Sequence, residues 1–178
     1  DLQGHAALYL HWDEARTQRL REQTQRLRIT PNTLIQAVWL LLLQRYTGQP
    51  TVCFGATVAG RPASLPGAEE MLGLFINTLP VVQTPQPHQR VSDWLSQLQG
   101  HNLELRDHEH AALALAQRCS ALPAGAPLFS ALLNYRHGSA APAHDAHAEA
   151  AWQGIELLHA QERTNYPLTL SIDDLGDA

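Results

Sequence analysis

The chain has 178 residues, 44% of them hydrophobic and 16% charged, which is enough apolar material for the core of one domain or a large part of one. The formal net charge is −5 at pH 7 and every cationic side chain is an arginine, which argues against a nucleic-acid binder and against docking on an anionic membrane. Two cysteines, Cys53 and Cys119, and no signal peptide predict reduced thiols in a cytoplasmic protein. Because the chain begins at Asp1 rather than Met, we expect an excised segment of a longer protein.

The first third of the chain predicts two helices and a strand. Asp13 is a typical N-cap for an Arg- and Gln-rich surface helix over residues 13–28. Thr30 can cap a second helix over residues 30–46, whose lack of charge predicts that it is covered on most sides. Residues 51–59 are apolar on both alternating faces, which indicates a central strand with helices packed on it.

The remainder predicts further strands and helices in alternation. Helices are expected at 91–108 and 111–118, and strands at 74–82, 128–135, 152–161 and 166–172, the last two paired. Pro80 inside the first of these strands implies a sheet edge or a bulge. The Ala-rich stretch 138–151 reads as a mobile loop. These elements favour an α/β (or α+β) fold, with helices packed on a mixed sheet.

Short motifs do not predict a metal or nucleotide site. No Walker A loop, nucleophile elbow or dinucleotide fingerprint is present. The pairs His108/His110 and His144/His147 lack further ligands in a suitable pattern, and we interpret them as solvated side chains. Asp173-Asp174 could bind a cation, although a strand-ending turn explains the pair more simply.

The exit of the central strand carries a more specific pattern, Phe54–Pro62 (FGATVAGRP). Gly55 and Gly60 permit a close approach of backbone or ligand. A half-buried Arg61 is expected to be held by a carboxylate, with Glu69 and Glu70 close in sequence.

This pattern and five neighbouring segments resemble the condensation domain of nonribosomal peptide synthetases, in the right order and over essentially the whole chain. The neighbours are residues 33–48 (TLIQAVWLLLLQRYTG), 65–67 and 71–80 (LPG and MLGLFINTLP), 127–135 (PLFSALLNY) and 162–174 (ERTNYPLTLSIDD). The resemblance implies a chloramphenicol-acetyltransferase-like half-domain. It also implies a parent activity, in which the amine of an aminoacyl thioester attacks an acyl or peptidyl thioester and an amide forms.

The resemblance also implies partners and a missing catalytic group. Both substrates would ride on phosphopantetheine arms of carrier domains, so no cofactor is expected on the chain itself, and an adenylation domain would be adjacent. The family's His-His-x-x-x-Asp-Gly signature is absent, because no two histidines are adjacent. Residues 1–178 would therefore be the C-terminal region of a partial condensation domain that needs its N-terminal half and is inactive alone. A non-catalytic module that binds a carrier protein, or part of an epimerisation or cyclisation domain, remains an alternative.

No catalytic residue is expected within the chain, but the resemblance implies residues that line the substrate tunnel. They are Gly55, Thr57, Ala59, Gly60, Arg61, Gly73, Asn77, Thr78, Asn134, Tyr135, Asn165 and Tyr166. Neutral hydrogen-bonding groups among them suit an uncharged thioester and amide better than ion pairs do. For Asn77 and Thr78, a role in strand register is the alternative, and for Tyr135 and Tyr166, a role in packing. Ala59 stands where the family often has a serine, whose hydroxyl is lost here.

Overall fold

A computed structural model describes residues 4, 6–61, 65–68, 70–123, 125–138, 154 and 164–175. Its elements in chain order are α1 (Glu14–Leu27), α2 (Pro31–Thr47), β1 (Val52–Val58), β2 (Asn77–Gln83), α3 (Val91–Arg106), α4 (Leu113–Cys119), β3 (Ala131–His137) and β4 (Leu168–Asp174). The expected strand at 152–161 and the expected loop at 138–151 lie outside the described residues, apart from Gly138 and Gly154.

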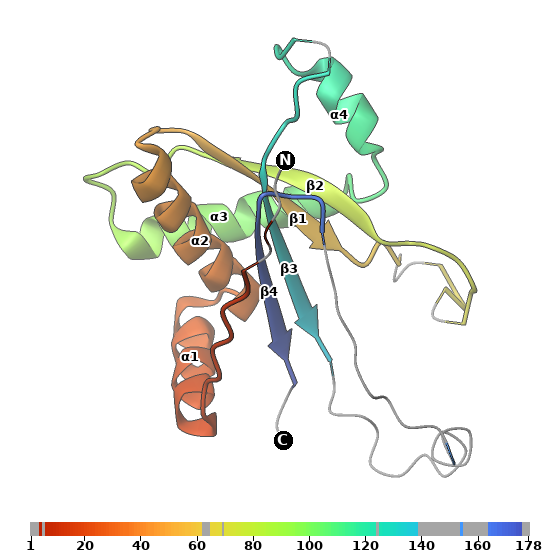
Figure 1. Cartoon of the computed structure of the whole chain (residues 1–178). Coiled ribbons are helices and arrows are strands. Elements are labelled where there is room, and N and C mark those ends of the chain that lie inside the picture. The colour runs from red at the N-terminus through yellow and green to blue at the C-terminus, as the bar shows by residue number, and fades with distance from the viewer. Residues whose placement is uncertain are drawn as a thin grey trace.

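The described strands form one mixed sheet in the order β2-β1-β3-β4 (Figure 1). β1 pairs antiparallel with β2 and parallel with β3, and β3 pairs parallel with β4. The predicted central position of β1 is confirmed. Pro80 lies on β2, an outer strand of this sheet, as its missing N–H group requires.

Helix ends follow the sequence closely. The side chain of Asp13 accepts a hydrogen bond from the Arg16 amide at 2.8 Å, and that of Thr30 accepts one from the Thr33 amide at 3.1 Å. Gly48, with φ 66°, ends α2 in the left-handed conformation that glycine adopts without strain. The two N-terminal helices therefore begin as the capping residues predict.

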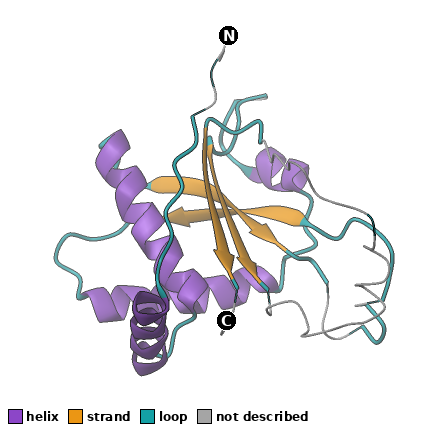
Figure 2. Cartoon of the chain, turned by 60° about the horizontal axis from the view of Figure 1, so that its bottom comes forward, coloured by secondary structure: helices purple, strands orange, loops and turns teal. Residues whose placement is uncertain are grey.

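The hydrophobic core lies between one face of the sheet and helices α2 and α3, while α4 lies apart and contacts β2 (Figures 1 and 2). Phe54 of β1, Leu40 of α2 and Leu98 of α3 are fully buried there. Each such side chain contributes roughly 1.5–3 kcal/mol relative to its exposed state. This burial is what fixes which face of the sheet meets the helices.

The expected cover around α2 is wrong for the described part of the chain. Its core side is buried, but Val38, Leu41, Leu42 and Tyr46 are exposed. The absence of charge in the sequence did predict an apolar helix, but it did not show that the side of the helix away from the core is exposed.

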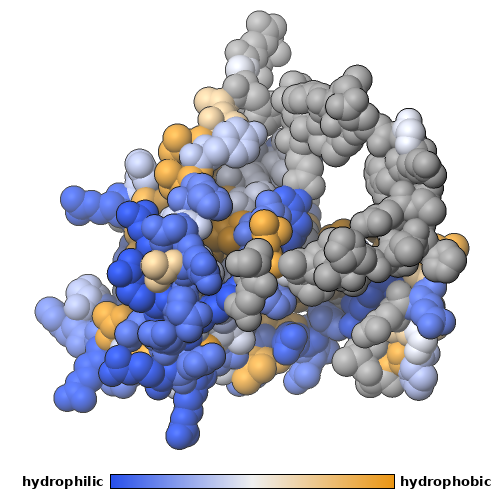
Figure 3. Space-filling view, turned by 90° about the horizontal axis from the view of Figure 1, so that it is seen from below, coloured by the Kyte–Doolittle hydropathy of each residue, from blue (hydrophilic) through white to orange (hydrophobic). Residues whose placement is uncertain are grey.

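The surface of the N-terminal helix α1 is hydrophilic, in contrast to the apolar outward side of α2. Hydrophilic side chains gather over the end of the molecule where α1 lies (Figure 3), in keeping with its Arg- and Gln-rich sequence. No helix among the described residues is long and apolar enough to cross a membrane.

Candidate functional site

The sheet has two unlike faces, set by the alternation of side chains along each strand. Phe54, Val81 and Leu133 point into the core beneath α2 and α3. Their strand neighbours therefore point to the opposite side, which we call the open face. In the four described strands the open face consists of Cys53, Gly55, Thr57, Thr78, Pro80, Val82, Leu132, Asn134, Arg136, Thr169, Ser171 and Asp173.

One row across the open face, two residues after Gly55 on β1, carries neutral hydrogen-bonding groups. Thr57 pairs in register with Thr78, and Asn134 with Ser171. Thr57, Thr78 and Asn134 are half-buried. Ser171 and the neighbouring Thr169 were missed in the sequence analysis, although the period of two along residues 168–174 could have placed them. The result is a surface of hydroxyl and amide groups suited to an uncharged ligand.

The charges on the open face of the strands neutralise each other. The Arg136 Nε donates to Asp173 Oδ1 at 2.6 Å, and its guanidinium also donates to Oδ2 at 3.2 Å. Within the four described strands this face holds no histidine. It can bind and orient a neutral group by hydrogen bonds, but these strand residues place no free proton acceptor on it.

Two aromatic rings cover the centre of the open face. A Cβ on Gly55 would lie 2.3 Å from the Phe129 ring and 2.8 Å from the Thr78 methyl group. The rings of Phe129 and Tyr166 stack with their centroids 5.5 Å apart. Gly55 is therefore needed for packing against Phe129, a residue that the sequence analysis did not single out; its predicted role in a tunnel stays a prediction.

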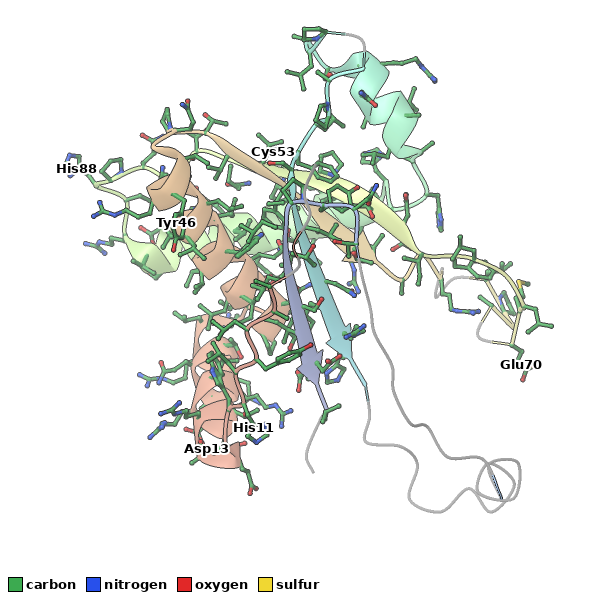
Figure 4. All side chains as sticks on the ribbon, in the orientation of Figure 1. His11, Asp13, Tyr46, Cys53, Glu70 and His88 are labelled. Atoms are coloured by element: carbon green, nitrogen blue, oxygen red, sulfur yellow. The ribbon has the colours of Figure 1, made fainter. Side chains whose placement is uncertain are left out.

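Cys53 lies at the end of the same face, at the sheet (Figure 4). Burial raises the pKa of the Cys53 thiol from 9.0 to about 11. Because the thiolate is the nucleophilic form, this cysteine is a poor candidate for covalent chemistry near neutral pH.

The loop after β1 is fixed by backbone contacts. Gly60 has φ 64°, and a Cβ there would lie 1.9 Å from the Phe75 carbonyl oxygen, so the chain requires glycine. Residues 74–76, which were expected in the strand, lie outside the sheet, and β2 begins at Asn77. Gly73 also has a positive φ, of 155°, and Ala59 is exposed.

Arg61 is held by main-chain carbonyls of the same loop. Its Nη1 donates to the carbonyl oxygens of Ala68 and Met71, and the guanidinium lies 4.6 Å from the centroid of the Phe75 ring. The expected carboxylate partner stays a prediction, because Glu69 lies outside the described residues.

Asn77 and Tyr135 point away from the open face, to the helix side. Asn77 Nδ2 donates to the carbonyl oxygens of Glu109 and Ala111, both at 2.8 Å, which ties β2 to the connection between α3 and α4. The Tyr135 hydroxyl donates to Asp174 at 2.7 Å, and burial followed by this hydrogen bond raises the tyrosine pKa. The structure thus separates these two residues from Thr57, Thr78 and Asn134. Asn165 is exposed in the segment before β4.

A shallow surface pocket of about 260 Å³ lies where the loop meets the end of α3. It is lined by Gly60, Leu74, Phe75, Ile76, Asn77, Glu109, His110 and Ala112. His110 Nε2 lies 3.7 Å from Glu109 Oε1, and the imidazole is exposed. Across the described part of the chain, no three His, Cys, Asp or Glu side chains are grouped to hold a metal ion. The pair His144/His147 lies outside it.

Comparison with known proteins gives one consistent family. Residues 4–178 match the family model described as condensation domain. Malpinin synthetase of Mortierella alpina is 43% identical over 158 residues, which are 89% of this chain and 2% of that protein. A linear gramicidin synthase of Brevibacillus parabrevis is 38% identical over 170 residues, which are 96% of this chain and 3% of that protein. The chain therefore spans a small part of each relative.

Solved structures agree with this result. The condensation domain from the Monacolin K polyketide synthase MokA is similar with a TM-score of 0.61 at 25% identity, covering 72% of this chain and 30% of that one. A four-domain nonribosomal peptide synthetase bound to AMP and glycine has a TM-score of 0.61 at 18% identity over 70% of this chain and 10% of that one, which shows a shared fold alone.

Proposed function

The chain belongs to the condensation-domain family, and on that premise we propose that residues 1–178 are the C-terminal region of a condensation domain in a nonribosomal peptide synthetase. The parent forms an amide between an acyl or peptidyl thioester and the amine of an aminoacyl thioester. Both substrates arrive on the phosphopantetheine arms of carrier domains, and an adenylation domain supplies the aminoacyl group. The chain contributes one wall of the channel in which they meet.

The observation that carries this proposal is the open face of the sheet. Beside the aromatic rings that cover its centre, the groups of Thr57, Thr78 and Asn134 are neutral and half-buried. A pantetheine arm and a thioester are uncharged, and they gain orientation from hydroxyl and amide partners without the desolvation cost of an ion pair.

The same face indicates what the chain lacks. Positioned proton transfer contributes about 10²–10⁴-fold to such reactions. The strand residues of the open face present no histidine, and the one carboxylate among them, Asp173, is paired with Arg136. We therefore propose that the proton-handling group comes from the N-terminal half of the domain, and that residues 1–178 alone form no amide.

The test compares the longer synthetase that contains this domain with residues 1–178 alone. Each is supplied with donor and acceptor carrier proteins loaded with aminoacyl-pantetheine groups, and amide formation is followed by mass spectrometry. We expect product with the longer protein and none with residues 1–178. Product from residues 1–178, or none from the longer protein across a panel of loaded carriers, contradicts the proposal.

A further inference from the structure

Phe129 and Tyr166 form an aromatic pair on the open face, at the start of two neighbouring strands. β3 and β4 run parallel, and Leu132 pairs in register with Thr169. Phe129 and Tyr166 each lie three residues before one member of this register pair, and a main-chain hydrogen bond of 3.4 Å joins the two segments. The stacking of the two rings therefore follows from the parallel pairing of the strands.

The Phe129 ring is a fixed support for the Tyr166 ring. Phe129 is buried, but it does not belong to the core cluster beneath α2 and α3. A Cβ on Gly55 would lie 2.3 Å from the Phe129 ring and 2.8 Å from the Thr78 methyl group, so the ring lies over Gly55 and next to Thr78. Tyr166 stacks on this buried ring with an angle of 25° between the two planes.

The aromatic pair borders a row of neutral groups that crosses the open face. Gly55 and Leu132 are register partners, so two residues further along each strand Thr57 lies beside Asn134. Neighbouring rows on one face of a sheet are about 7 Å apart, a distance that aromatic side chains can bridge. We call the four residues of this row, in strand order Thr78, Thr57, Asn134 and Ser171, the polar row.

Tyr166 carries a hydroxyl group that the described fold does not use. The Tyr135 hydroxyl donates to Asp174, whereas the Tyr166 hydroxyl makes no hydrogen bond within the part of the chain that the structure describes. Tyr166 is also half-buried, so part of its side chain is accessible. A phenol donates to a carbonyl oxygen without carrying a charge, and a ring already held by stacking loses little freedom when it does so.

We propose that Tyr166 positions the carbonyl group of a pantetheine-linked substrate beside the polar row, with its hydroxyl as the hydrogen-bond donor and Phe129 as the support of its ring. This inference rests on the proposed function, because that function makes the open face a wall of the channel. The group that Tyr166 recognises is an uncharged thioester or amide carbonyl, which the donor and the acceptor substrate both carry.

Steady-state kinetics of amide formation by the longer synthetase test the proposal, with the loaded donor and acceptor carriers varied separately. Tyr166→Phe removes the hydroxyl and keeps the stacked ring, so we expect kcat/KM to fall about threefold to tenfold for at least one carrier, with the free energy of unfolding unchanged. A rise in KM for one carrier assigns the carbonyl to the donor or to the acceptor, and a fall in kcat alone assigns the hydrogen bond to the reacting complex.

The matched control is Tyr46→Phe, which removes an exposed hydroxyl on α2, at the helix side of the sheet. We expect this variant to keep the wild-type kinetics. An unchanged kcat/KM for both carriers in Tyr166→Phe overturns the proposal. A lower free energy of unfolding with unchanged kinetics also overturns it, because the hydroxyl would then bond to protein rather than to substrate.

A double-mutant cycle tests the part of Phe129. Phe129→Leu removes the support of the Tyr166 ring, so we expect kcat/KM to fall and Tyr166→Phe to have little further effect in this background. Independent effects of the two substitutions overturn the supporting role of Phe129. Product from the wild type with an unchanged Tyr166→Phe variant rejects the positioning role alone, whereas no product from the wild type across a panel of loaded carriers rejects the proposed function, and this inference with it.

Discussion

At Gly55 the need for glycine comes from a neighbouring ring rather than from the backbone. The Phe129 ring fills the space of the missing Cβ, at 2.3 Å, on the face that we assign to the channel. We expect Gly55→Ala to destabilise the protein by about 1–3 kcal/mol, because the ring must move away from Thr78 and Tyr166. Urea denaturation followed by tryptophan fluorescence measures the change.

A second substitution separates crowding from other effects of the alanine. Phe129→Leu removes the ring that the new Cβ meets. Gly55→Ala should therefore lower the free energy of unfolding clearly less in the Phe129→Leu background than in the wild type. Equal costs in the two backgrounds would show that the Phe129 contact does not explain the glycine.

The hydrogen bonds of the Asn77 side chain indicate that it stabilises the fold. Its two donors satisfy the carbonyl oxygens of Glu109 and Ala111, and its own Oδ1 accepts from the Thr78 amide at 2.9 Å. Asn77→Ala leaves these partners unpaired, and we expect a loss of about 1–3 kcal/mol in unfolding free energy. Asn165→Ala, an exposed amide, is the matched control and should change it by less than about 0.5 kcal/mol. Similar losses for both variants would contradict the assignment.

Among the elements, those with strong local signals were predicted well. Asp13 and Thr30 cap the first two helices, Gly48 ends the second, and Pro80 lies on an outer strand. Caps and turn residues act over three or four positions, so their effect can be inferred from local sequence. The predicted start of β2 at residue 74 was wrong, because the strand begins at Asn77, where its pairing with Val58 of β1 begins, and such pairing is not encoded in local sequence.

The candidate site was harder to predict than the strands that carry it. Thr78 and Asn134 lie on the open face, whereas their strand neighbours Asn77 and Tyr135 point to the helix side. Because neighbouring residues on a strand point to opposite faces of the sheet, a shift of one position moves a side chain to the other face. The local sequence did not indicate which of the two faces the helices cover. Phe129 was missed because its role depends on contact with Gly55, which is 74 residues away in the numbering.

The contact of α1 with the sheet depends on a shared carboxylate. Asp174 at the end of β4 accepts from Arg21 of α1 at 2.9 Å and from the Tyr135 hydroxyl at 2.7 Å, and His137 Nδ1 lies 3.2 Å away. We expect Tyr135→Phe to lower the unfolding free energy by about 1–2 kcal/mol at pH 7, because one hydrogen bond to the largely buried Asp174 carboxylate is lost. Tyr46→Phe, at an exposed position, should have no effect.

The difference in unfolding free energy between the wild type and Tyr135→Phe should depend on pH in one direction. The pKa of Tyr135 is raised in the folded state, so the folded protein favours the neutral phenol. The contribution of Tyr135 to the free energy of unfolding is complete below the ordinary tyrosine pKa of 10.0 and is lost as the pH rises above that value. The wild type should therefore lose its advantage over Tyr135→Phe above pH 10, as measured by urea denaturation at several pH values. An advantage that grows with alkaline pH would contradict this account.

For the whole molecule, the two sides of the sheet have different requirements. The helix side is closed by α2 and α3, and the outward side chains of α2, Val38, Leu41 and Leu42, which we call the outer ridge, are apolar and exposed. The open side is covered at its centre by Phe129 and Tyr166 and is polar in the row beside them, and under the proposed function it needs a second wall to enclose a substrate. The exposed outer ridge and the face that is proposed to need a second wall therefore lie on opposite sides of the sheet.

The outer ridge also predicts how residues 1–178 behave when they are produced alone. Exposed Val38, Leu41 and Leu42 should associate between molecules, because burying apolar surface is favourable wherever it occurs. We expect light scattering to give a mass well above the 19.7 kDa of one chain, and Leu42→Glu to shift the mass toward that value. Ser96→Glu adds the same charge on α3 away from the ridge and should leave the association unchanged. A wild-type monomer at all concentrations, or equal effects of the two variants, would show that the ridge does not drive association.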